Sequence, residues 1–253
     1  MKKLLLLLLG LSYLVLTANA LLAAEEVVKM SYLCRDLKGN SRWRAEAEIK
    51  NISPGVYLMT EKAEGIYSSF KGRISWIAEM KFERTKDNIR PISLDKRVFD
   101  SKGSVIRREK QEFDLAGNTG ICTHEEPVRK VSRTRKFKFD KDVVTRLSLG
   151  LYAQKFLESG KTSEKLQMVS EEPNVYNIEL KRMGKEAIDI GGHKIVAFRL
   201  CVDPMLGALN FVKPFLPRSY AWHSAAPEYG WLGYTGLEGG INSEKVEVLI
   251  EEL

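Results

Sequence analysis

One short segment, residues 122–126 (CTHEE), combines residue types that could bind a metal ion. In an extended strand Cys122, His124 and Glu126 would project from the same face, and thiolate, imidazole and carboxylate are all ligands for zinc or copper. Such a site needs one or two further ligands, and the chain has only two other histidines. Pro127 follows directly, so the simpler interpretation is a surface strand that ends there. We predict no metal site and no cofactor.

Nucleophilic catalysis would need a serine or cysteine with a histidine and an orienting carboxylate. Ser224 lies beside His223, but adjacent residues of a strand point to opposite faces. The sequence has no G-x-S-x-G motif. The glycines of residues 230–240 (GWLGYTGLEGG) precede no predicted helix and lack the lysine of a phosphate-binding loop, so they predict hairpin turns. We therefore expect a protein that is not an enzyme, with an enzyme of unrecognised type as an alternative.

Positive charge is concentrated in one segment. Residues 96–138 hold 12 Lys and Arg against 6 Asp and Glu. In a predicted strand at 128–139, lysines fall on one face, and two arginines interrupt the apolar pattern of the other, which we therefore expect to be partly buried. The strand could contact anionic lipid head groups or envelope glycans. Alternatively, its charges protect a sheet edge from pairing. The candidate anionic-surface contacts are Lys130, Arg133, Arg135, Lys136 and Lys138.

The C-terminal third is rich in aromatic residues. Aromatic side chains can fill the interior of a barrel, or they can line a pocket for an apolar ligand where prolines and glycines keep its cover loose. The pocket hypothesis places an acyl chain or another apolar envelope component between a helix and the inner face of a sheet. The candidate ligand-lining residues are Trp76, Met80, Phe82, Val144, Leu147, Leu151, Tyr152 and Trp222.

One segment of the chain predicts an amphipathic helix, residues 140–161 (DKDVVTRLSLGLYAQKFLESGK). Its apolar residues recur at helical spacing and form one broad face. Asp140 or Asp142 can cap the start, and Gly160 can end the helix. We predict a helix over about 142–159.

The rest of the chain predicts β-strands. Residues 43–50 and 74–83 alternate apolar and polar side chains, which is typical of strands with one buried face. Prolines and glycines after Asp203 make long strands improbable before residue 244. Many strands with a single helix predict a mainly β fold, an antiparallel barrel or half-barrel with the helix docked on or in it. The other predicted strands are 27–36, 56–63, 89–99, 104–113, 165–169, 175–182, 186–190, 193–202 and 244–250.

The N-terminus has the pattern of a secretory signal peptide. Two lysines precede an apolar run at residues 4–16, and Ala18-Asn19-Ala20 supplies small residues for cleavage after Ala20. The run is shorter than the roughly 20 residues of a spanning helix, which makes an uncleaved membrane anchor the weaker alternative. We predict a signal peptide at 1–20, a single β-rich domain at 21–253, periplasmic localisation and no membrane span after cleavage.

Charge and cysteine content limit the possible partners. Removing the two lysines of residues 1–20 lowers the net charge from +7 to +5, which does not predict nucleic-acid binding. Cys34, Cys122 and Cys201 are an odd number in an oxidising compartment, so either one disulfide with a free thiol or three buried thiols is possible. Cys34 shares strand parity with apolar neighbours, which favours a buried position. We expect a monomer.

From Asp142 onward the order of predicted elements resembles an exported bacterial family known only as a domain of unknown function. The matching features are the helix ending in 157–160 (LESG), the strand and turn at 177–192, the strand at 195–200, Trp222-His223-Ser224 followed by Pro227, and the glycine-containing hairpin with a last strand at 236–250. Relatives carry an aspartate where this chain has Ala225-Ala226. The resemblance implies a periplasmic or envelope-associated β-rich protein, distantly like the half-barrel carriers that shuttle lipoproteins. It implies no known reaction.

These observations favour a monomeric, exported protein that binds an apolar, acyl or lipid-like ligand without catalysis. The alternative is a fully packed barrel that acts as an interaction or assembly protein through its basic strand.

Overall fold

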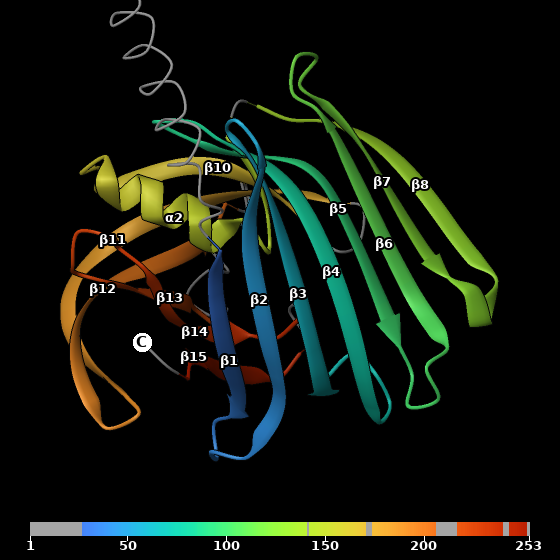
Figure 1. The fold of residues 1–253 in the computed structure, drawn as a ribbon, viewed down its shortest axis with the longest axis horizontal. Helices are drawn as coiled ribbons and strands as arrows, with labels where there is room; N and C mark the ends of the chain where they lie inside the picture. Colours follow the sequence, from blue (N-terminus) through green and yellow to red (C-terminus); the bar gives the residue numbers. More distant parts are fainter. Residues whose placement is uncertain (1–26, 141, 171–173, 206–216, 240–242, 252–253) are drawn as a thin grey trace, which may run out of the picture.

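The computed structural model describes residues 27–140, 142–170, 174–205, 217–239 and 243–251. In this part of the chain fifteen strands form one curved sheet that does not close on itself, and a single α-helix lies within its curve (Figure 1). The prediction of a mainly β fold, an antiparallel half-barrel with one docked helix, is confirmed. Residues 1–20, with the predicted cleavage site, lie outside the described residues. The described part contains no helix that is long and apolar enough to cross a membrane.

The elements have the following bounds. The strands are β1 (Val28–Asp36), β2 (Ser41–Ser53), β3 (Val56–Ile66), β4 (Arg73–Arg84), β5 (Ile89–Phe99), β6 (Val105–Asp114), β7 (Thr119–Glu126), β8 (Val131–Lys138), β9 (Val143–Thr145), β10 (Ser163–Val169), β11 (Val175–Ile190), β12 (His193–Pro204), β13 (Ser219–Ser224), β14 (Trp231–Leu237) and β15 (Lys245–Ile250). The helices are the 3₁₀ turn η1 (Pro127–Arg129) and the α-helix α2 (Leu149–Glu158).

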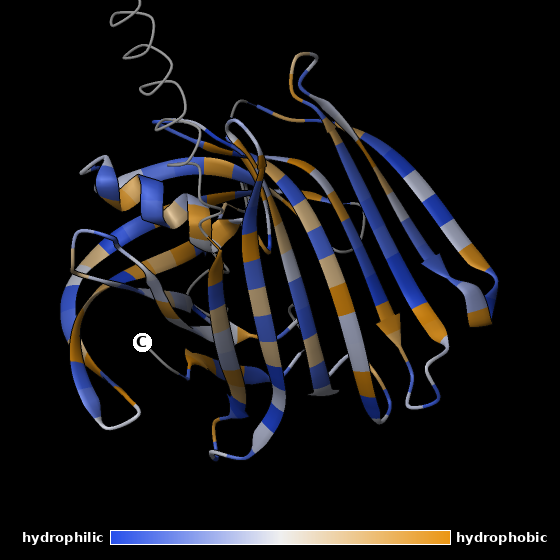
Figure 2. Ribbon diagram, viewed as in Figure 1, coloured by the Kyte–Doolittle hydropathy of each residue, from blue (hydrophilic) through white to orange (hydrophobic). Residues whose placement is uncertain are grey.

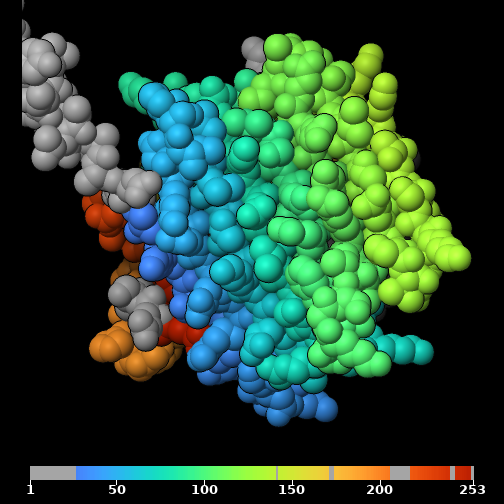
Figure 3. All heavy atoms as spheres, turned by 45° about the vertical axis from the view of Figure 1, so that its right-hand side comes forward, coloured from blue at the N-terminus to red at the C-terminus, as the bar shows by residue number. Residues whose placement is uncertain are grey.

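The first and last described strands, β1 and β15, pair in the middle of the sheet. The strand order is β8-β7-β6-β5-β4-β3-β2-β1-β15-β14-β13-β12-β11-β10-β9. Neighbouring strands are antiparallel except β9 and β10, which are parallel. The edge strands are therefore β8 and β9, which follow each other in the sequence. Figure 3 shows β2 to β8 side by side across the surface, with β8 at its margin.

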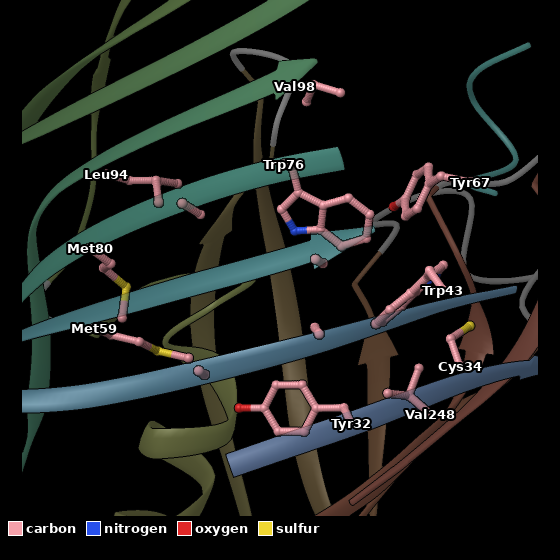
Figure 4. Packing of buried hydrophobic residues seen from close by; sticks show 14 of the residues in the cluster. Tyr32, Cys34, Trp43, Met59, Tyr67, Trp76, Met80, Leu94, Val98 and Val248 are labelled. Atoms are coloured by element: carbon pink, nitrogen blue, oxygen red, sulfur yellow. The ribbon is translucent and has the colours of Figure 1, made fainter. Parts of the chain in front are cut away.

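The inner face of the sheet is apolar from β1 to β5. Alternation along β2 and β4 is visible as alternating colours in Figure 2, and it places Trp43, Trp76, Met80 and Phe82 inside, each at most 7% exposed. Figure 4 shows Trp43, Trp76 and Met80 within this cluster. A glycine is required beside Trp43, because a Cβ on Gly65 would lie 2.2 Å from the carbonyl oxygen of Arg42, and because Gly65 has φ +147°.

The helix begins at Leu149, and the prediction that it starts near residue 142 is wrong. Residues 143–145 instead form β9, which pairs with residues 167–169 of β10. Two valines and a threonine favour a strand, and the available partner strand outweighs their helical spacing. The N-cap is Ser148 and not an aspartate, because the helix begins only at Leu149. The carboxylate of Asp142 instead accepts a hydrogen bond from Asn88 Nδ2 at 2.9 Å. The predicted end at Gly160 is confirmed by its left-handed backbone, φ +72°.

The helix packs between two walls of the sheet. On one side Tyr152 and Phe156 belong to a buried cluster with side chains of β10, β11 and β12. On the other side Leu151, with Leu147 from the preceding turn, packs against the apolar face of β1–β5. A hydrogen bond of 3.4 Å from Thr145 Oγ1 to the sulfur of Met80 joins β9 to β4. The helix therefore holds the two halves of the curved sheet together.

Several strands differ in extent from the predicted ones. The strands predicted at 175–182 and 186–190 are one strand, β11, with a register shift at Gly184. The basic strand begins only at Val131, because η1 precedes it and Lys130 adopts a left-handed backbone, φ 54°. Two short strands, β13 and β14, lie in the C-terminal region where we predicted no long strand. Gly191 and Gly192 form the tight turn between β11 and β12, with φ 58° and 85°.

Candidate functional site

The apolar section of the interior, defined as the inner face of β1–β5, is bordered beside the helix by partly exposed side chains. Met30, Leu147, Leu151 and Trp231 pack against this section but are only partly buried. We call these four residues the helix seam. The indole of Trp231 meets the ring of Tyr32 edge-on, with centroids 5.1 Å apart. The seam is therefore an apolar strip between the helix, β1 and β14 that water can reach.

The structure divides the predicted ligand-lining residues between the two sides of the helix. Trp76, Met80 and Phe82 are buried in the cluster against which Leu147 and Leu151 pack, so these three form a floor beneath the seam. Val144 and Tyr152 are also buried, but they pack on the other side of the helix in the cluster with β10 to β12.

Trp222 does not join this set. It packs in a separate cluster with Ile190, Ala197 and Leu232, and its Nε1 donates a hydrogen bond of 2.6 Å to Oε1 of Glu186. Sequence alternation could not place it, because the register of β13 against β14 shifts at this tryptophan.

Ionisable side chains form a row across the inner face. The register makes successive neighbours, from β3 to β8, of six residues, five of them ionisable and one an alanine: Glu61, Ala78, Lys96, Glu109, His124 and Arg133. Within the apolar section Glu61 accepts a hydrogen bond of 2.8 Å from Trp76 Nε1, and Lys96 Nζ lies 5.6 Å from the centroid of the Trp76 ring. Towards β8, Glu109 is 2% and His124 is 6% exposed. The interior thus changes from apolar to charged along the curve of the sheet.

A hollow of about 290 Å³ lies at the charged end of this row. We call it the arginine hollow, and it is lined by His124, Glu126, Arg129, Val131, Arg133, Arg135 and Asn174. It lies at β7 and β8, away from the helix seam. Its walls carry three arginines and one glutamate, which makes it electropositive.

Hydrogen bonds hold most of the walls of the arginine hollow in place. Glu126 accepts bonds from Arg129 Nη1 at 3.1 Å and Arg107 Nη2 at 3.4 Å, and its Oε1 lies 3.3 Å from His124 Nε2. Burial alone would raise the pKa of Glu126, but the His124 hydrogen bond and the two guanidinium charges lower the pKa below its ordinary value. Arg135 Nη1 donates to Asn174 Oδ1 at 2.8 Å. Glu126 is therefore an anion that fixes the arginines around it.

The predicted anionic-surface contacts are divided between the two faces of β8. Arg133 and Arg135 line the arginine hollow, on the same face as the buried ring of Phe137. Lys136 and Lys138 alternate with them and point to the convex face, while Lys130 lies in the turn before the strand. The expectation that the face interrupted by arginines is only partly buried is confirmed.

The CTHEE segment provides no metal site in the described part of the chain. Cys122 and His124 share the inner face of β7, as predicted, but no group of three or more His, Cys, Asp or Glu residues is placed to hold a metal ion there. The three cysteines are free and buried, which confirms the alternative with three buried thiols. Burial and the nearby carboxylate of Glu109 raise the pKa of Cys122 to about 12, so this thiol stays protonated.

His223 and Ser224 each have a local structural role. The His223 side chain is fully buried, its Nδ1 lies 2.8 Å from the carbonyl oxygen of Tyr229, and burial lowers its pKa to about 4. The hydroxyl of Ser224 accepts a hydrogen bond from the amide of Ala226 at 3.1 Å. The pair thus stabilises the connection from β13 to β14.

Comparison with protein-family models, curated proteins and solved structures finds no match to the chain. The resemblance to an exported bacterial family therefore stays a prediction, and function must be argued from the geometry of the interior.

Proposed function

We propose that the chain is an exported, non-catalytic binding protein for an apolar ligand with an acyl or lipid-like chain. The observation that carries this proposal is the helix seam, whose leucines, methionine and tryptophan pack against the apolar section but remain partly accessible. Export to the periplasm rests on the pattern of residues 1–20. The family resemblance points to the same compartment.

Hydrophobic burial supplies the driving force for binding at the seam. Covering apolar surface contributes about 25 cal/mol per Å², so an acyl chain laid along Met30, Leu151 and Trp231 gains affinity without any polar contact. The buried side chains beneath, such as Met80, are already packed. The ligand therefore lies along the seam first, and it contacts the floor only where the helix moves away from β1.

The test is a titration with a fluorescent fatty acid. Leu147→Trp adds bulk at the seam, where a partly exposed side chain tolerates it, so we expect uptake to fall at least tenfold while the denaturation midpoint stays unchanged. Leu37→Trp makes the same substitution at a position that is 65% exposed in the turn after β1, and it should leave both quantities unchanged. A parent protein that takes up no fatty acid, with a lowered midpoint for Leu147→Trp, would contradict the proposal and favour a packed interaction module.

A second candidate function is contact with an anionic envelope surface. The observation that favours it is that β8 ends the sheet in the described part of the chain, with Lys136 and Lys138 on its convex face. Each lysine near an anionic membrane contributes about 1 kcal/mol. Replacing both by glutamine should weaken co-sedimentation with phosphatidylglycerol vesicles, whereas the same change at two exposed convex-face lysines of β3 and β4, Lys62 and Lys81, should not. Equal losses in both variants would mean that only net charge matters.

A further inference from the structure

The arginine hollow has the features of a second binding site, separate from the helix seam. Three of its lining residues are arginines, and two of them are already held in place, Arg129 by Glu126 and Arg135 by Asn174. The Arg133 side chain has no hydrogen-bonded or ionic partner among the described residues, although it lines the same hollow as the other two. An unused guanidinium beside two fixed ones makes this hollow suited to an anion.

His124 provides a second, independent indication of a missing ligand. Its side chain is 8% exposed and lines the hollow. Its Nε2 faces Glu126, but its Nδ1 is buried with no hydrogen-bond partner in the described part of the chain. Buried polar atoms without a partner are uncommon and call for an explanation such as an absent ion. The oxygen or hydroxyl of a bound acid group would supply a partner in either protonation state of the ring.

The hollow is separate from the apolar section. Between them Gln111 is 1% and Cys122 is 0% exposed, and Gln111 Nε2 donates a hydrogen bond of 3.0 Å to the carbonyl oxygen of Ser170. The hollow is thus flanked by buried side chains on the side of the sheet that leads to the seam. A ligand of the hollow therefore does not need an acyl chain, and its recognition depends on its charged group.

We propose that the arginine hollow binds a phosphate group, either free phosphate or the head group of a phospholipid. Guanidinium groups match phosphate oxygens with paired hydrogen bonds, which are stronger than bonds between neutral groups. Arg133 makes the direct contact, Arg129 and Arg135 complete the positive wall, and the amide of Asn174 and the ring of His124 add polar contacts. Glu126 also lines the hollow, where its bonds to Arg107 and Arg129 already offset its negative charge.

The experiment measures the affinity of the full mature chain for inorganic phosphate at constant ionic strength, by calorimetry. Arg133→Gln removes the guanidinium that has no internal partner, so the fold should keep its denaturation midpoint. We expect it to weaken phosphate binding about tenfold, the loss of one charge-assisted hydrogen bond. Lys136→Gln is the matched control, because it removes the same charge three residues further along β8 from the opposite face.

Two outcomes would overturn the proposal. One is a parent protein that binds no phosphate, and the other is an equal loss of affinity in Arg133→Gln and Lys136→Gln, which would reflect net charge alone. A loss confined to Arg133→Gln supports the site. A soluble short-chain phosphatidic acid then identifies the source of the phosphate, since tighter binding than inorganic phosphate indicates a lipid head group and equal binding indicates the free anion. Fatty-acid uptake at the seam is unaffected by Arg133→Gln, so this test is separate from that of the proposed function.

Discussion

Replacing Phe156 by alanine tests whether helix α2 is a fixed part of the core or a loosely held cover. Phe156 is 2% exposed and packs with buried side chains of β10 to β12, so its removal should cost about 3–5 kcal/mol. Leu151, one turn earlier, is only partly buried at the seam, and truncating it should cost less than about 2 kcal/mol because water already reaches the site. The difference in free energy of unfolding between the two variants therefore measures how much more tightly one side of the helix is packed than the other.

Urea denaturation of the two variants, followed by tryptophan fluorescence, gives both free energies of unfolding. A cost of this size for Phe156→Ala is a large share of the roughly 5–15 kcal/mol that stabilises a typical domain, so its midpoint should fall clearly below that of Leu151→Ala. Equal midpoints would refute the reasoning, because they would show that both sides of the helix are packed alike. A Phe156→Ala midpoint equal to that of the parent would show that the helix is not docked through this residue.

Three further predictions follow from buried groups and backbone geometry. Burial lowers the pKa of His223 from 6.5 to about 4, so as pH falls the unfolded chain binds a proton before the folded chain does. The free energy of unfolding should therefore decline between pH 6.5 and 4, and it should decline less in His223→Asn. Identical pH profiles of the urea midpoint in the parent and the variant would argue against this. Burial raises the pKa of Cys34 and Cys122 to about 12, so neither should react with a thiol reagent at pH 8 until the protein unfolds, and labelling of the native chain would contradict the packing. Gly65→Ala should destabilise the protein by about 1–3 kcal/mol, because the added Cβ clashes with the backbone of β2. Gly39→Ala should cost less, because a Cβ there meets nothing within 4 Å. Equal costs would mean that the positive φ of both glycines, and not the clash, causes the destabilisation.

The strands around the apolar section could be predicted because one face of each strand is exposed to solvent and the other is buried. In residues 74–83 the alternation identifies Trp76, Met80 and Phe82 as inward-facing, and the structure buries all three. The start of the helix could not be predicted in this way. Val143 and Val144 fit a helical pattern equally well, and the parallel partner that makes them a strand comes from residues 167–169, which no local pattern reveals.

The arginine hollow was only partly visible in the sequence. The parity of Arg133 and Arg135 with Phe137 correctly indicated a partly buried charged face. The buried position of Glu109 could have been found by counting back in steps of two from Phe113, since both lie on the inner face of β6. Asn174 could not have been found, because it reaches the hollow from the connection between β10 and β11, and only the curvature of the sheet brings that connection to β8.

The meeting of the first and last strands in the middle of the sheet has a consequence for folding. From β1 to β8, and again from β10 to β15, every strand pairs with its neighbour in sequence, so each half can form by local hairpin steps. The pairing of β1 with β15 joins Tyr32 to Ile250 and depends on almost the whole chain. Such distant contacts are slow to form. Until the two halves join, β1 and β15 are both unprotected strand edges, so this junction is where an incompletely folded chain is most exposed to aggregation.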